Sequence, residues 1–113
     1  MRIVDDILIM DELKRMAGVF FGDMVKAVVD VDRGILAVDA ELHADLEVLL
    51  LDNGSQQKNL WGINLYPEMP GEDFLEYDSM INIRPSQGNK SRGVDNPEVR
   101  DKIAQIVDKK VQR

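Results

Sequence analysis

The sequence contains no cysteine, only one histidine and few aromatic residues, and each shortage excludes a class of chemistry. Without cysteine there is no disulfide, no thiolate-ligated zinc and no thiol nucleophile, which fits a reducing compartment. Trp, Tyr and Phe together make up only 5% of the chain. No GxSxG, kinase, Walker or dinucleotide motif occurs. We therefore expect no cofactor, and no familiar catalytic signature indicates an enzyme.

Long apolar runs are absent as well. The longest central run, Val48–Leu51, is far shorter than the roughly 20 residues that cross a bilayer. Asp5 and Asp6 interrupt the only N-terminal stretch that could resemble a signal peptide. We therefore expect a cytoplasmic protein that does not associate with membranes.

Negative charge dominates the composition. The 113 residues include 14 Lys and Arg against 21 Asp and Glu, giving a net charge of −7. Such an acidic chain is a poor binder of duplex DNA, because affinity for DNA comes mainly from neutralising phosphates. Its length, with 44% hydrophobic and 31% charged residues, fits a single globular domain over residues 1–113.

The spacing of hydrophobic residues predicts the secondary structure of the first half of the chain. Apolar residues at helical spacing follow Asp11, the expected N-cap, and Gly22 ends that helix. Two β-branched runs within residues 24–39 flank a turn and predict a hairpin. A leucine stripe from Leu42 to the stop at Asn53-Gly54 predicts a second helix.

The second half repeats this order. Residues 60–66 and 74–84 alternate in polarity, which predicts two further strands, and Pro97 begins a final helix capped by Asp95 or Asn96. The order α-ββ-α-ββ-α indicates an α+β fold: an antiparallel sheet of about four strands, with helices packed mainly on one face. The other face would then carry polar residues, among them Asn64, Tyr66 and Asn82.

Five stretches of the chain resemble a known family. They are GDMVKAVVD, ELHADLE, LWGINLYP, SMINIRPSQGN and NPEVRDKI, which lie within roughly Gly22–Val107. They resemble a family of small prokaryotic proteins that is catalogued only as a domain of unknown function. The resemblance implies a single-domain prokaryotic protein and assigns no activity, cofactor or functional residue.

Positive charge gathers in one acid-free segment, residues 79–94. This segment carries a charge of +3, whereas the rest of the chain has 11 basic and 21 acidic residues. Two arginines, a lysine and short polar side chains are suited to binding a phosphate or carboxylate. The alternative is that the basic residues pair with the excess acids and that the polar residues cap the last helix. The predicted anion-binding residues are Arg84, Ser86, Asn89, Lys90, Ser91 and Arg92.

His43 is the only side chain with an unperturbed pKa near neutrality, and it lies among carboxylates. On a helix, His43 and Glu47 share one face, as do Glu41 and Asp45, so a divalent metal is an alternative ligand. If the segment is extended, His43, Asp45 and Glu47 share a face instead. The set lacks HExxH spacing, which favours an ordinary solvated helix face.

These features favour a binding module for a phosphate-containing ligand, or for single-stranded RNA stacked on Tyr66 and Arg84. One alternative is an enzyme that processes phosphate esters, with His43 as general acid or base and with Arg84 and Arg92 stabilising charge. Another is a purely structural or protein-interaction domain. The Val-rich first hairpin, if one edge is free, would also favour a homodimer.

Overall fold

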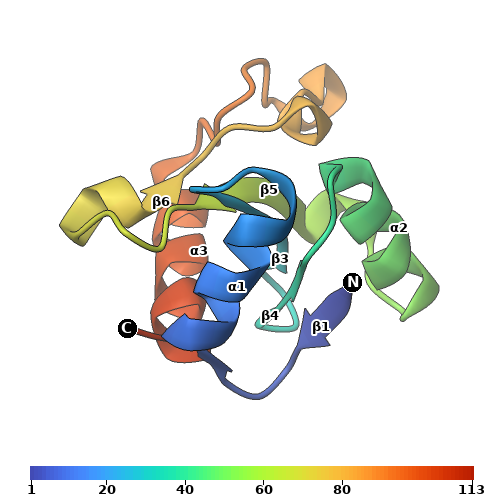
Figure 1. Cartoon of the computed structure of the whole chain (residues 1–113). Coiled ribbons are helices and arrows are strands. Elements are labelled where there is room, and N and C mark those ends of the chain that lie inside the picture. Colours follow the sequence, from blue (N-terminus) through green and yellow to red (C-terminus); the bar gives the residue numbers. More distant parts are fainter.

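A five-stranded antiparallel sheet forms the centre of the computed structural model, which describes all residues from 1 to 113 (Figure 1). The strand order is β1-β4-β3-β5-β6. The predicted α+β class with an antiparallel sheet is therefore confirmed, with one more strand than the expected four. The strands are β1 Arg2–Val4, β3 Val25–Asp30, β4 Ile35–Val38, β5 Leu60–Leu65 and β6 Leu75–Glu76.

Three strands near the chain ends were not expected. β1 adds to the free edge of β4, and β2 (Leu8–Ile9) pairs in parallel with β7 (Val111–Gln112). Strands of two or three residues are too short to show a period of two, so sequence patterns do not reveal them. The second, two-stranded sheet joins the two ends of the chain.

The three predicted helices are confirmed: α1 Met10–Phe20, α2 His43–Asp52 and α3 Pro97–Lys110. The expected cap of α1 is wrong, because β2 leads directly into α1 and the extended residue Ile9 occupies the N-cap position. Asp11 lies instead in the first turn, where the helix dipole favours a carboxylate. α3 is capped by Asn96, whose side chain accepts a hydrogen bond from the Glu98 N–H. None of the helices has the length and apolar character needed to cross a bilayer.

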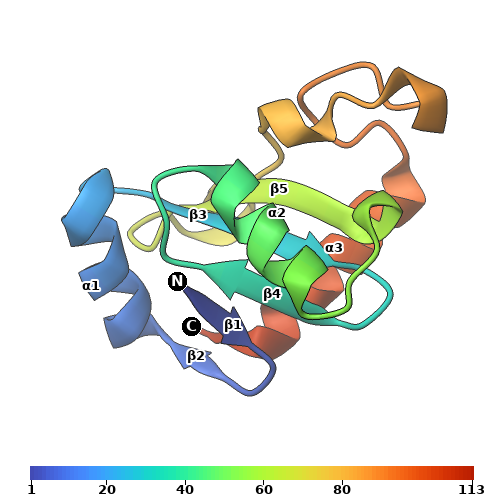
Figure 2. The ribbon, with the colours of Figure 1, turned by 90° about the vertical axis from the view of Figure 1, so that its right-hand side faces the viewer.

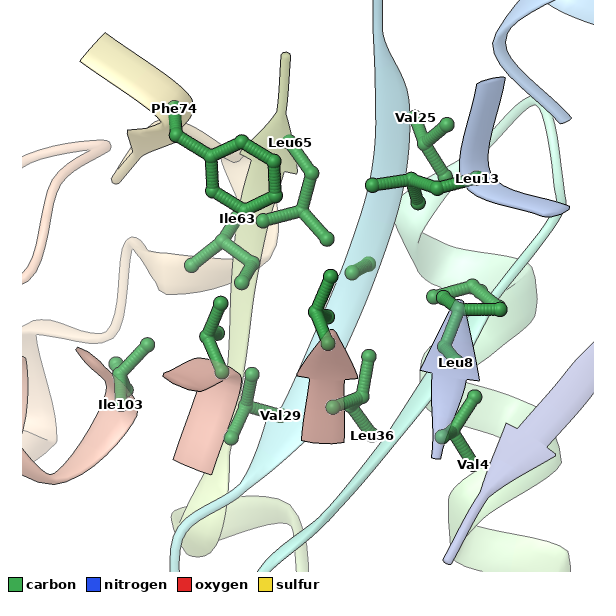
Figure 3. Close-up of a cluster of buried hydrophobic side chains, with 14 of the residues drawn as sticks. Val4, Leu8, Leu13, Val25, Val29, Leu36, Ile63, Leu65, Phe74 and Ile103 are labelled. Atoms are coloured by element: carbon green, nitrogen blue, oxygen red, sulfur yellow. The ribbon is translucent and has the colours of Figure 1, made fainter. Parts of the chain in front are cut away.

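The helices cover both faces of the sheet. α1 and α3 pack on one face and α2 on the other (Figure 2). β5 contributes apolar side chains to both faces, because successive side chains of a strand point in opposite directions. Trp61, Ile63 and Leu65 belong to the larger core cluster, and Leu60 belongs to the cluster under α2. Figure 3 shows the larger core, which includes Val29, Leu36, Ile63 and Leu65 of the sheet and Ile103 of α3.

The first hairpin lies in the interior of the sheet. Its turn is held by the Asp30 carboxylate, which accepts hydrogen bonds from the Asp32 and Arg33 N–H groups at 2.9 and 3.0 Å. Both of its edges are paired, with β1 along β4 and with β5 along β3. The free hairpin edge that favoured a homodimer therefore does not exist, and the homodimer itself stays a prediction.

The predicted strand over residues 74–84 is wrong after Glu76. β6 ends there, and residues 80–82 form the short 3-10 helix η3 (Met80–Asn82), whose first turn is capped by the Ser79 hydroxyl. Two polar side chains of this segment, Asn82 and Arg84, instead contact the backbone of β5. The other 3-10 helices are η1 Gln57–Asn59, η2 Gly71–Phe74 and η4 Pro85–Gln87.

Candidate functional site

The basic segment 79–94 lies against the edge of β5 that β6 leaves uncovered. β6 pairs only with Asn64 and Leu65. Beyond them, the Asn82 amide donates to the Gly62 carbonyl at 2.9 Å and accepts from the Gly62 N–H at 2.8 Å. A Cβ at position 62 would lie 2.5 Å from the Ser79 Cβ, so only glycine permits this close approach. Asn82, predicted to be a polar surface residue, is therefore a fully buried substitute for a strand.

Arg84 continues this cover along the same edge. Its guanidinium donates to the carbonyls of Gln57 and Leu60 at 2.5 and 2.8 Å and lies 4.2 Å from the centre of the Trp61 ring. Burial lowers the pKa of Arg84. A guanidinium held by two carbonyls and an aromatic ring has a structural role here, and it is not free to stack with Tyr66.

The loop also supplies its own anion, Asp95. The Asp95 carboxylate accepts from the Ser91 hydroxyl at 2.5 Å and from the Lys90 N–H at 3.0 Å, and these hydrogen bonds hold its pKa below the usual value. Asn89 is buried beside it and donates to the carbonyls of Asn82, Ser91 and Gly93. Asp95 lies one residue beyond the acid-free segment, which is why counting charges within the segment missed it.

Arg92 is paired as well. Its Nε lies 2.7 Å from one oxygen of Asp78, and its Nη2 lies 3.3 Å from the other. Of the six residues predicted to bind an anion, Arg84, Asn89, Ser91 and Arg92 thus have partners within the chain, while Ser86 and Lys90 are exposed. Ligand binding at this loop stays a prediction, and the structure favours the second interpretation of the segment, in which its polar groups have structural partners.

A cavity of about 450 Å³ opens between β3, β5, η3 and the start of α2, and we call it the His43 cavity. It brings together groups from distant parts of the sequence, including His43 and Arg92. Its polar lining residues are Lys26, His43, Asn64, Tyr66, Glu76, Asp78, Ser79 and Arg92. Its apolar lining residues are Met24, Leu42, Ala44, Met80 and Ile81.

His43 is the first residue of α2 and is buried against the sheet. Its Nε2 lies 2.8 Å from the Ile63 carbonyl oxygen, which can only accept, so Nε2 carries a proton. In the neutral ring Nδ1 is then the acceptor. Burial lowers the pKa of His43 as the main effect, and the nearby Lys26 charge lowers it further. The imidazole is therefore a neutral, oriented base at physiological pH.

Glu76 organises the opposite wall of the cavity. One oxygen of Glu76 accepts from the Asn64 amide at 2.8 Å and from the Tyr66 hydroxyl at 3.0 Å. Burial, and then this hydrogen bond, raises the pKa of Tyr66 to about 12. Asn64 is only 5% exposed, yet its Oδ1 has no hydrogen-bond partner, which is rare for a buried polar atom. The predicted polar pair Asn64 and Tyr66 thus belongs to this cavity.

The structure does not assemble the predicted metal alternative. Glu41 precedes α2 and Asp45 is exposed, whereas His43 is directed at the sheet and Glu47 is half-buried. No group of three histidine or carboxylate side chains is arranged to hold a metal ion. The helical interpretation of this segment is confirmed from His43 onward.

Three other cavities of similar size carry less chemistry. One, of about 500 Å³, lies between η2, β6 and α3 and is lined by core residues such as Phe74 and Val107. Another, of about 560 Å³, is lined by five carboxylates with Tyr66, Met69 and Leu75. The third, of about 450 Å³, lies beside Met10 and Met69. Only the His43 cavity combines a buried histidine, both signs of charge and an unsatisfied buried acceptor.

Sequence reasoning missed Lys26, Glu76 and Asp78 as members of the site. Alternation does place Lys26 and Asn64 on the outward positions of their strands, but only the pairing of β3 with β5 makes them neighbours. Alternation places Glu76 and Asp78 on one face of the expected strand, but the strand ends at Glu76, so the pattern did not indicate which groups they would meet.

A family model matches residues 2–110, which is nearly the whole chain, and its description is Protein of unknown function (DUF5674). No curated protein and no solved structure matches this chain. The resemblance noted in the sequence motifs therefore extends over almost all of the fold, from β1 through α3, and this chain belongs to the DUF5674 family.

Proposed function

We propose that this domain is a binding module whose ligand, a small polar molecule, occupies the His43 cavity. The observation that carries the proposal is the convergence there of an oriented neutral histidine, a Tyr–Glu–Asn network and a lysine without an ion pair. A mainly preformed hollow with a few converging polar groups and shifted pKa values is typical of a ligand site.

Lys26 is the cation that the cavity offers to a ligand. Its ammonium lies 5.1 Å from the centre of the Phe21 ring and takes part in none of the ion pairs of the structure. The predicted preference for an anionic group therefore moves from the 84–92 loop to Lys26. A phosphate and a carboxylate share this chemistry, and single-stranded RNA is a less favoured ligand because Arg84 is not free.

The test is a binding screen followed by NMR on ¹⁵N-labelled protein with amino acids, mononucleotides, inorganic phosphate and simple carboxylates. We expect at least one class to shift the amides of Lys26, Asn64 and Glu76 together with the His43 ring protons. Shifts confined to Ser86–Lys90 would return the site to the loop. The absence of any cavity shift at millimolar ligand would contradict the proposal.

A second candidate is the phosphate-processing enzyme, which one observation favours: His43 and Arg92 line the same cavity. In this version His43 is the general base and Arg92, released from Asp78, stabilises developing charge, while Arg84 has no part. Hydrolysis of bis(p-nitrophenyl) phosphate that disappears in His43→Ala, and persists in the control Lys58→Ala, would support it. Equal rates in both variants would eliminate it.

A further inference from the structure

The His43 cavity contains two opposite charges that lack ionic partners. Arg92 and Asp78 neutralise each other through their paired contacts at 2.7 and 3.3 Å. Neither Lys26 nor Glu76 forms an ion pair, although both line the same cavity. Glu76 uses Oε1 to hold Asn64 and Tyr66, and its Oε2 is not engaged by them. A ligand with only one charge would therefore pair with Lys26 or with Glu76 and leave the other without an ionic partner.

The register of the sheet places the two charged residues in one row across neighbouring strands. Lys26 on β3 is the direct partner of Asn64 on β5, and Asn64 is the direct partner of Glu76 on β6. The three residues thus form a row across neighbouring strands, with the cation and the carboxylate at its ends. Because adjacent strands lie about 4.8 Å apart, the Cα atoms of Lys26 and Glu76 are separated by about 10 Å.

A backbone separation of this size leaves room for a short zwitterion between the two side chains. In an α-amino acid the ammonium nitrogen lies about 2.5 Å from the carboxyl carbon. With one charge-assisted hydrogen bond of about 2.8 Å at each end, the molecule bridges about 8 Å. The flexible lysine stem lets its ammonium group approach a ligand of this length.

The rim of the cavity is apolar. Leu42 and Met80 line it with 54% and 66% of their surfaces exposed, and Met24 and Ile81 lie beside them. Exposed apolar side chains next to a polar floor favour a ligand with a polar head and an apolar tail. A methionine-containing rim can adapt to tails of different shape.

Building on the proposed function, we infer that the ligand is a free α-amino acid with an apolar side chain. Its carboxylate lies at Lys26, its ammonium group lies at Glu76, and its side chain contacts Leu42 and Met80.

The experiment compares leucine with two analogues that each lack one charge. 4-Methylvalerate is leucine without its ammonium group, and 3-methylbutylamine is leucine without its carboxylate. Binding is measured by calorimetry and by the cavity amide shifts. We expect leucine to bind about ten- to a hundredfold more tightly than either analogue, as one charged hydrogen bond warrants.

Two variants assign the ends of the ligand. Lys26→Met should weaken leucine binding about tenfold or more and leave 3-methylbutylamine unchanged. Glu76→Gln, which retains the acceptor for Asn64 and Tyr66, should weaken leucine and leave 4-methylvalerate unchanged. Thermal unfolding of each variant shows whether the fold is retained, and native-like amide spectra are required before binding is compared.

The outcomes separate this inference from the proposed function. If 4-methylvalerate shifts the cavity amides and binds as tightly as leucine, the zwitterion is wrong and the cavity remains the binding site. If only phosphate or a nucleotide shifts these amides, the amino-acid inference is likewise overturned. If no compound shifts them, both proposals fail.

Discussion

The side-chain amide of Asn82 forms two hydrogen bonds with the backbone of Gly62, as a neighbouring strand would. Asn82→Ala leaves a buried N–H and a buried carbonyl without partners, and we expect a loss of roughly 2–4 kcal/mol in the free energy of unfolding. Urea denaturation measures this loss. The exposed amide Gln105 on α3 provides the control, since Gln105→Ala should change stability little. Equal stability of the two variants would contradict this role.

Glycine is required at position 62 for steric reasons. We expect Gly62→Ala to destabilise the domain by about 1–3 kcal/mol, because the new methyl group meets Ser79 and forces the segment away from the edge of β5. Gly18 lies within α1 with nothing near its Cβ position, so Gly18→Ala should stabilise by about 0.5–1 kcal/mol. Thermal unfolding of the pair tests this. Shifts of the same sign in the two variants would contradict this account.

Arg84 is expected to act through its planar guanidinium. Arg84→Lys keeps the charge but cannot hold two carbonyls while stacking on Trp61, and it should cost about 1–2 kcal/mol of stability. Because Trp61 is the only tryptophan, its fluorescence should change in this variant and stay constant in the exposed control Arg15→Lys. If instead Arg84 proved free to bind phosphate with native-like Trp61 fluorescence, the structural role would be wrong.

His43 should titrate below its ordinary value of 6.5, because burial disfavours the imidazolium. The unfolded chain then takes up a proton at a higher pH than the folded one. Stability from this group is therefore complete above pH 6.5 and falls as the pH drops from 6.5 toward the folded pKa. The slope is at most about 1.4 kcal/mol per pH unit.

The measurement is an NMR titration of the histidine ring protons, which is unambiguous because the chain has one histidine. In His43→Gln the loss of stability between about pH 7 and about pH 5 should flatten, while carboxylates continue to act at lower pH. A midpoint at or above 6.5 would show that the hydrogen bond to Ile63, together with Asp78 and Asn64, outweighs burial.

Local patterns predicted the helices, the first hairpin and β5, since these elements have clear periods and turn residues. They failed at residues 77–84, where polar side chains alternate as in a strand but the chain leaves the sheet and Asn82 and Arg84 bond to the edge of β5. They also failed for Asp11, because an extended strand runs straight into α1 and no cap is used.

The candidate site was predicted only in part. His43, Asn64, Tyr66 and Arg92 were singled out from the sequence, and the structure brings them into one cavity. Arg84 does not line this cavity, because its guanidinium lies over Trp61. Its position at the end of an expected strand gave no sign that its side chain would fold back onto this ring. Lys26 and Glu76 depend on the register of three strands, which arises from long-range pairing and leaves no mark in local sequence.

The central claim, that a ligand binds in the His43 cavity through Lys26, is tested most directly by comparing two lysine variants. Affinity for the ligand found in the screen is measured by calorimetry in Lys26→Ala and in Lys90→Ala, which removes the exposed lysine of the basic loop. We predict a loss of about tenfold or more in Lys26→Ala and unchanged affinity in Lys90→Ala. Loss of affinity in Lys90→Ala with native binding in Lys26→Ala would contradict the claim and place the ligand on the loop.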